Sequence, residues 1–232
     1  MLGVIVALPW ELKSLTRETI APGSWKAIAP QTLVAVSGMG VERAREAAAL
    51  LIAQGATALM SWGYAAALDE RLTDGCLVLP ERIIGASGES YPVDSQWHER
   101  LYLVSAFKLS VWTGAVVESE NVVATAAEKI ALNERTGAAA VDMESAAHAR
   151  AAAERGLPYV AVRAIVDTAS TGIPEAVLQA RDAQGGIDVG KLLGACRKPA
   201  DWIQVARLAA QFRAAQKTLR RAMRFALDCS PV

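Results

Sequence analysis

The amino-acid sequence predicts an α/β fold in one domain, with buried strands lying between helices. Strand-like apolar segments alternate with segments whose apolar residues recur every three or four positions, as in amphipathic helices. Several strand-like segments are almost continuously apolar, which is typical of strands buried on both faces of a parallel sheet. The chain has 232 residues, of which 53% are hydrophobic, and this is enough for one sizeable core. We therefore expect a single domain over residues 1–232.

Apolar runs and turn residues place the elements in order along the chain. The apolar run at residues 2–8 stops at Pro9. The next strand, over residues 32–36, ends before the glycine pair Gly38 and Gly40. Gly88 and Pro92 make residues 89–97 loop-like. We predict strands over residues 2–8, 32–36, 56–62, 75–84, 110–117, 138–141 and 159–166. We predict helices over residues 11–19, 41–54, 96–107, 125–135, 145–155 and 199–227.

Charge and cysteine content exclude several classes of protein. The 24 basic and 24 acidic residues balance, so no overall field favours nucleic acid. Cys76, Cys196 and Cys229 lie far apart without metal-site spacing, which favours free thiols in the cytoplasm. The apolar N-terminus lacks a basic start and soon meets Pro9 and Glu11, so we interpret it as a strand and not as a signal peptide. No apolar run is long enough to predict a membrane-spanning helix.

The segment VDMES, residues 141–145, organises the predicted fold. A short apolar strand stops there at Asp142 and Glu144, directly before an alanine-rich helix. In an α/β sheet this junction lies at the carboxyl edge of the strands, where ligands bind. A carboxylate at that edge can accept hydrogen bonds from a polar ligand such as a sugar diol. The alternative is helix capping. An acid at a helix start interacts favourably with the helix macrodipole and stabilises the helix by up to ~1 kcal/mol.

Besides Glu144, two more acids stand at predicted strand ends, which makes three: Glu11 follows the first strand and Asp167 follows the strand over 159–166. Clustered carboxylates repel one another and burial penalises their charge, so three on one sheet edge favour a polar ligand or shifted pKa values. Nearby, Gly38 and Gly40 open a helix with bare backbone N–H groups, which favours an anion or a hydroxyl there. Each acid alone has an ordinary alternative as a capping or turn residue.

Four segments taken together resemble one enzyme superfamily. They are GVIVALPWE (3–11), SGMG (37–40), VDMESAA (141–147) and RAIVD (163–167). They resemble the purine nucleoside phosphorylase and uridine phosphorylase superfamily, in particular its methylthioadenosine/S-adenosylhomocysteine nucleosidase branch. SWG (61–63), VDMES and the basic tail after Ile173 resemble most closely the hopanoid-associated phosphorylases, which release adenine from the lipid-linked nucleoside adenosylhopane. The resemblance implies a three-layer fold with a central mixed, twisted sheet flanked by helices.

The resemblance also implies a role for each site residue. Cleavage of a ribosyl C–N bond builds positive charge on the sugar and negative charge on the departing base, so a proton donor and a positioned nucleophile are needed. Asp167 resembles the general acid at purine N7, and Glu11 resembles the carboxylate that orients the attacking water. Glu144 resembles the residue that binds the ribose hydroxyls. The other implied contacts are Met143 against the sugar, Ser37, Gly38 and Gly40 on the nucleophile side, and Val122 or Val123 beside adenine.

Departures from the family pattern bear on the choice between hydrolysis and phosphorolysis. Arginine is the side chain best suited to hold phosphate, and phosphorylases of this superfamily commonly carry one after the first strand and one before the glycine loop. Here those places hold Glu11 and the segment SWG. A carboxylate repels phosphate, and only Arg43 and Arg45 could replace the missing charge. We therefore expect hydrolysis without a cofactor, with phosphorolysis, in which phosphate is a co-substrate, as the alternative.

The predicted helix over 199–227 is amphipathic and basic. Residues 197–224 hold eight basic residues and one acidic residue. Its apolar stripe either packs on the sheet or docks on an anionic membrane at the cytoplasmic face, which would suit a lipid-linked nucleoside. Relatives are dimers or larger rings, so the resemblance also implies a homo-oligomer.

Two other kinds of function stay open on the sequence. A non-catalytic nucleoside-binding protein would be expected to lose Asp167 or Glu144, and both are present. A Rossmann dehydrogenase would need a third glycine after Gly38 and Gly40. No metal is predicted, because neither His98 nor His148 has a metal-ligand partner three or four residues later.

Overall fold

The computed structural model describes residues 1–180 and 188–231 of the chain. In these residues, eleven strands form one sheet. The strands are β1 (Leu2–Val6), β2 (Ser24–Ala29), β3 (Thr32–Val36), β4 (Ala58–Ala67), β5 (Leu77–Val78), β6 (Arg82–Ile84), β7 (Ser90–Pro92), β8 (Val111–Trp112), β9 (Ala115–Glu118), β10 (Ala140–Asp142) and β11 (Tyr159–Asp167). The helices are α1 (Pro9–Leu15), α2 (Val41–Ala53), α3 (Ser95–Ala106), α4 (Ala126–Thr136), α5 (Ser145–Ala153), α6 (Glu175–Gln179), α7 (Val189–Ala195) and α8 (Pro199–Ala226).

Parallel strands form the centre of the sheet. β1 pairs in parallel with β3 and β4, and Val4 stands between Val34 and Met60. β11 pairs in parallel with β4 on another edge. All five residues of β1 and of β3 are buried, which explains their nearly continuous apolar sequence. The sequence therefore predicts these strands well.

The sheet divides at the end of β4. There β4 pairs with the antiparallel β10, which leads to β9, β6 and β7. β11 pairs instead with β5, and its register with β4 shifts between Ile165 and Asp167. β10 and β11 also end there, with Val141 and Asp167 both paired to Ala66, whereas β1 ends earlier along β4, where Ile5 lies beside Ser61. Backbone and side-chain groups from several strands therefore surround one space.

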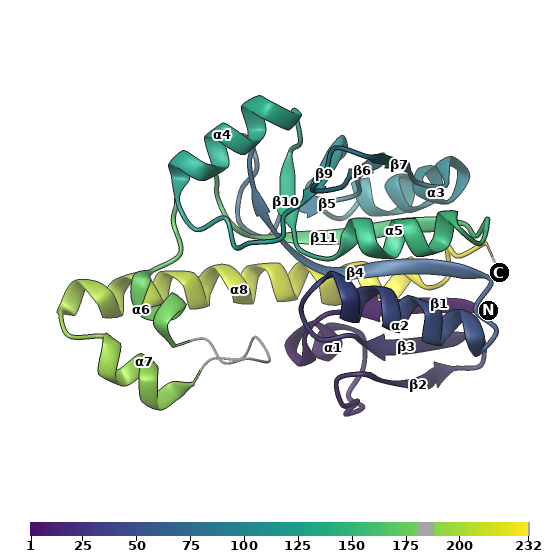
Figure 1. Cartoon of the computed structure of the whole chain (residues 1–232), viewed down its shortest axis with the longest axis horizontal. Helices are drawn as coiled ribbons and strands as arrows, with labels where there is room; N and C mark the ends of the chain where they lie inside the picture. The colour runs from purple at the N-terminus through teal and green to yellow at the C-terminus, as the bar shows by residue number, and fades with distance from the viewer. Residues whose placement is uncertain (181–187, 232) are drawn as a thin grey trace.

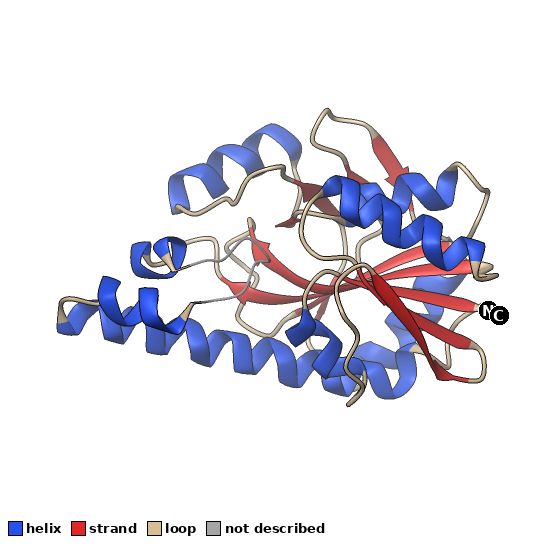
Figure 2. Cartoon of the chain, turned by 60° about the horizontal axis from the view of Figure 1, so that its bottom comes forward, coloured by secondary structure: helices blue, strands red, loops and turns tan. Residues whose placement is uncertain are grey.

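Helices cover both faces of the central sheet (Figures 1 and 2), as the predicted three-layer fold requires. α2 and α5 pack against each other and against β1, β3, β4 and β11. On the opposite face α8 runs beside β11 and contacts α1 and α3. The long yellow-green helix α8 extends well past the sheet, where α6 and α7 lie near its start (Figure 1). The apolar stripe of α8 is buried in its second half, at Ala215, Leu219 and Ala222, so it belongs to the protein core.

Several predicted element boundaries are wrong for identifiable reasons. The strand predicted over 75–84 is two strands, β5 and β6, separated by a segment containing Pro80. The strand predicted over 110–117 is interrupted at Gly114, which has φ +116°. β2 and β7 were not predicted, because these edge strands are largely exposed and carry no buried apolar run. The short helices α6 and α7 were missed as well.

Candidate active site

A cavity of about 530 Å³ lies where the sheet divides. Its polar wall carries four carboxylates, from Glu11, Asp142, Glu144 and Asp167. No lysine, arginine or histidine among the described residues lines it. The three acids that the sequence places at strand ends, 11, 144 and 167, are thus brought to one space. Their chemical roles stay a prediction.

Glu11 is fixed from two directions. Its Oε2 accepts hydrogen bonds from the backbone N–H groups of Ala7 (2.8 Å) and Leu8 (2.9 Å), so it caps α1 as the ordinary alternative requires. Its Oε1 accepts from the N–H of Tyr64 on β4 (3.0 Å), and this contact goes beyond capping. Burial raises the pKa of the Glu11 carboxyl, while the charge of Arg163 and these N–H groups oppose the rise.

Asp142 and Glu144 have different surroundings, although only one residue separates them. Asp142 caps α5, since its Oδ1 accepts from the N–H of Ser145 (3.2 Å). Glu144 makes no side-chain capping bond to α5, and its Oε1 accepts only a long hydrogen bond from Gly40 N–H (3.4 Å) among the described residues. The capping interpretation therefore applies to Asp142. Burial, followed by the charges of Asp142 and Glu11, raises the pKa of Glu144 to about 8.

Arg163 forms a buried polar network behind the cavity. Its Nε donates to Oδ2 of Asp142 (2.6 Å), and its Nη2 donates to the hydroxyls of Ser61 (2.6 Å) and Ser145 (2.7 Å). Nδ1 of His148 lies 2.8 Å from the same Ser61 hydroxyl. Arg163 does not line the cavity, so it orients Asp142 and the start of α5 from behind. A single arginine within an otherwise apolar strand was the sequence signal for this network.

Asp167 is paired with a buried lysine. Lys129 of α4 is fully buried, and its ammonium forms an ion pair with Oδ2 of Asp167. The same nitrogen donates to the carbonyl oxygens of Thr168 (2.8 Å) and Thr171 (2.7 Å). Burial raises the pKa of Asp167, and Lys129 opposes that rise. Sequence reasoning missed Lys129. Its only signal was its place three residues before Leu132, on the buried face of α4.

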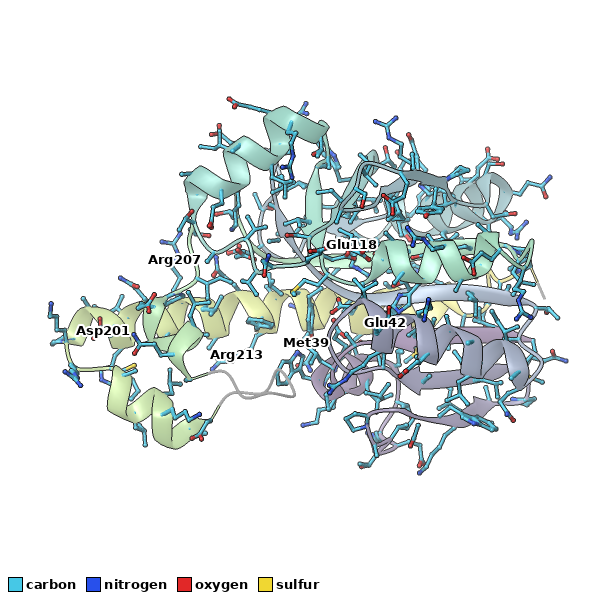
Figure 3. All side chains as sticks on the ribbon, viewed as in Figure 1. Met39, Glu42, Glu118, Asp201, Arg207 and Arg213 are labelled. Carbon is cyan, nitrogen blue, oxygen red and sulfur yellow. The ribbon has the colours of Figure 1, made fainter. Side chains whose placement is uncertain are left out.

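The remaining predicted site residues fall into two groups. Met143 and Val123 line the cavity, as does Val122. Ser37, Gly38 and Gly40 do not. The Ser37 hydroxyl donates to the carbonyl oxygen of Gly38 (2.7 Å), and the carbonyl oxygen of Val6 lies 3.3 Å from it. Met39, between the two glycines, supplies the lining there and lies between α2 and α8 (Figure 3).

The cavity continues as an apolar extension beyond the carboxylates. Its wall there comes from the segment after β11 and from α6, α7 and α8. The side chains are those of Ile173, Val177, Leu192, Val205, Leu208 and Phe212. Tyr64 joins the two regions, because its ring meets that of Phe212 edge to face at 5.4 Å between centroids. One cavity therefore offers a carboxylate-lined end and an apolar end. Among the described residues, no cluster of histidine, cysteine, aspartate and glutamate is placed to hold a metal ion.

The family of the chain is apparent from most of its length. A family model described as the phosphorylase superfamily matches residues 2–193. The chain belongs to the phosphorylase superfamily. That match includes all four carboxylates of the cavity in this superfamily member. No curated protein sequence matches it significantly.

Solved structures from bacteria share the fold of this phosphorylase-superfamily protein. One is the Helicobacter pylori 5′-methylthioadenosine/S-adenosylhomocysteine nucleosidase, with a TM-score of 0.75 and 15% identity over 98% of this chain and 97% of that chain. A second is the futalosine hydrolase of Helicobacter pylori, with a TM-score of 0.74, 16% identity and the same coverage. A third is the S-adenosylhomocysteine nucleosidase of Streptococcus pyogenes, with a TM-score of 0.72 and 19% identity over 100% of this chain and 97% of that chain. At these identities the likeness shows the fold.

Proposed function

We propose that the protein cleaves the N-glycosidic bond of an adenine nucleoside by hydrolysis. The solved structures that share its fold include nucleosidases and a futalosine hydrolase, and the family match covers the carboxylate-lined end of the cavity. In this proposal Asp167 protonates the departing base, Glu144 binds the ribose hydroxyls, and Glu11 orients the attacking water. The raised pKa of Asp167 suits a proton donor.

The observation that carries hydrolysis is the absence of a cation from the described wall of the cavity. Four carboxylates and no cation line it among the described residues. A phosphate dianion would be desolvated there without an arginine to hold it. Of the two arginines that the sequence left as substitutes, Arg45 pairs on the surface with Glu42 (2.9 Å). Arg43 lies over Gly38 and does not line the cavity. Water is the nucleophile that this wall accepts.

Adenine release measured with and without inorganic phosphate tests this proposal. We expect equal rates in both, with free ribosyl product, and loss of release in Asp167→Asn. Asp228→Asn, which changes an exposed acid, is the matched control. Strict phosphate dependence would instead establish phosphorolysis. Saturable nucleoside binding without any release would establish a non-catalytic binding protein.

The apolar extension supports a nucleoside with a large apolar 5′ substituent, and adenosylhopane is the substrate that we propose. Helices α6, α7 and α8 supply its wall, next to the carboxylates that would hold the ribose. Leu208→Gln should lower kcat/KM about tenfold for adenosine carrying a long alkyl 5′ chain and leave adenosine itself nearly unchanged, since one buried apolar side chain contributes about 1 to 3 kcal/mol. Leu103→Gln, on the exposed face of α3, is the control. Equal losses for both nucleosides would argue against the extension as the 5′ site.

We also propose contact with an anionic membrane, through the outward face of α8. The second half of the apolar stripe is buried and its first half lines the cavity, so the contact must use the opposite face. Five exposed cations follow one another there around a groove: Arg213, Lys217, Arg220, Arg221 and Arg224. The exposed Trp202 and Ile203 continue this face toward the helix start, and Arg213 extends from α8 in Figure 3. No helix among the described residues is long and apolar enough to span a membrane.

Sedimentation with vesicles containing phosphatidylglycerol tests this contact. Deleting the whole helix would remove core residues, so charge substitutions are the suitable change. Combined Lys217→Gln, Arg220→Gln and Arg221→Gln should abolish binding at about 0.1 M salt. Arg17→Gln, Lys26→Gln and Arg45→Gln remove as many exposed cations elsewhere and should leave it intact. Equal binding by both triple variants would end the proposal. The same preparations, by light scattering, test the expected homo-oligomer.

A further inference from the structure

The buried ammonium of Lys129 is a charged group that the proposed reaction does not yet use. All three of its hydrogens have acceptors: Oδ2 of Asp167, the carbonyl of Thr168 and the carbonyl of Thr171. No hydrogen bond among the described residues reaches the other oxygen of Asp167, Oδ1. Lys129 therefore fixes one oxygen of the proposed general acid, together with the turn that follows it, and the second oxygen has no hydrogen-bond partner in the described part of the chain.

Stability alone does not require this pair. Burying an ion pair costs desolvation energy, and replacing such a pair with apolar side chains is often neutral or stabilising. Lys129 is fully buried and the side chain of Asp167 is 4% exposed. The exposed Asp74, in the loop before β5, also acts on Asp167, and its negative charge favours the protonated form of that carboxyl. Lys129 is thus the only cation acting on Asp167 among its described neighbours.

We propose that Lys129 is a positioning residue for departure of the base, an inference that rests on the proposed function. Its ammonium holds Asp167 so that Oδ1 faces the base. When the C–N bond breaks, its electron pair goes to the base, the base nitrogen takes the proton of Asp167, and the carboxylate left behind is paired with Lys129. The ammonium keeps its own proton throughout this step.

The pH dependence of adenine release distinguishes this role from a purely structural one. A cation within about 4 Å lowers a carboxyl pKa by about 1 to 3 units. In Lys129→Met the pKa of Asp167 should rise, because burial then acts unopposed. The alkaline limb of the pH profile of kcat should therefore move to higher pH by at least about 1 pH unit. At the optimum, kcat should fall about 100-fold because Oδ1 loses its orientation, and KM should stay nearly unchanged.

Two further variants keep the test decisive. Arg135→Met removes an exposed cation from the same helix and should behave as the wild type. Lys129→Gln is neutral but can still donate to the threonine carbonyls, so it should fold and show the same shifted limb. The proposal would be overturned if both Lys129 variants kept the wild-type kcat and the wild-type alkaline limb of its pH profile. It would also be overturned if circular dichroism showed that neither variant folds. Absence of adenine release from the wild type would instead reject the proposed function.

Discussion

The carboxylate of Glu11 occupies the space that a side chain at Gly63 would fill. A Cβ atom at Gly63 would lie 2.8 Å from the carboxyl carbon of Glu11. Gly63 has an ordinary negative φ, so what requires glycine at this point of β4 is the close approach of Glu11. The next residue, Tyr64, donates its N–H to the same carboxylate. The missing side chain at Gly63 and the backbone N–H of Tyr64 together fix the position of Glu11, one of the proposed catalytic groups.

Gly63→Ala should lower activity more than stability. The added methyl group displaces Glu11 and breaks its bond to Tyr64, so kcat should fall at least about tenfold, as a misplaced catalytic group predicts. Gly194→Ala adds a methyl group where nothing lies within 4 Å and is the control. Steady-state adenine release and thermal unfolding measure the two effects. Unchanged kcat in Gly63→Ala would show that the position of Glu11 does not matter for the reaction.

Glu144→Gln should flatten the dependence of stability on pH. Burial raises the pKa of Glu144 to about 8, so between about pH 5 and pH 8 the folded state binds more protons than the unfolded state. The free energy of unfolding therefore falls as pH rises through this window, by roughly 2 to 5 kcal/mol. Urea unfolding at several pH values measures the slope. Glu99→Gln, at an exposed site, should keep the wild-type slope, and a wild-type slope in Glu144→Gln would contradict the assignment.

His148 should make the protein sensitive to acid. Burial, followed by the charge of Arg163, lowers the pKa of His148 to about 3. A histidine kept neutral in the folded state contributes stability above about pH 6.5, and this contribution is lost as pH falls toward 3. His148→Asn should remove that part of the acid dependence, while His98→Asn should not. Identical acid unfolding of the wild type and His148→Asn would show that another group is responsible.

The Arg163 and Asp142 pair should be strongly coupled. Removing one partner leaves a buried charge without compensation, so Arg163→Met should cost about 3 to 5 kcal/mol of stability. Asp142→Asn combined with Arg163→Met should cost less than the sum of the single changes. A double-mutant cycle by urea unfolding measures this coupling. Additive losses would mean that the serine hydroxyls, and not Asp142, are the partners that matter to Arg163.

The sequence predicts the parallel strands and the acids at their ends because both follow local rules. β1 and β3 read as continuous apolar runs, and Glu11 and Asp167 lie at or beside the ends of such runs. The cations could not be predicted in the same way. Arg163 meets Ser61 from 102 residues away, and Lys129 meets Asp167 from 38 residues away. Which cation pairs with which acid depends on the tertiary fold, and a single charged residue in an apolar pattern does not contain that information.

The apolar extension was missed for a related reason. Its wall combines two short helices with one side of the first half of α8. Apolar spacing predicted α8 as one amphipathic helix, but spacing alone does not tell a core face from a cavity wall. The structure separates them along the helix, with Val205, Leu208 and Phe212 in the cavity and Leu219 and Ala222 in the core.

This division within α8 lets the proposed 5′ site change through evolution while the core contacts of the helix are kept. Substitutions in the first half of the helix reshape the wall of the extension, while the second half remains anchored against the sheet. Since sites without shared partners change stability almost independently, new specificities can be sampled there without unfolding the domain. A library confined to the four cavity-lining positions of α8, Val205, Leu208, Ala209 and Phe212, is the natural starting point for engineering variants with other groups at the proposed 5′ site.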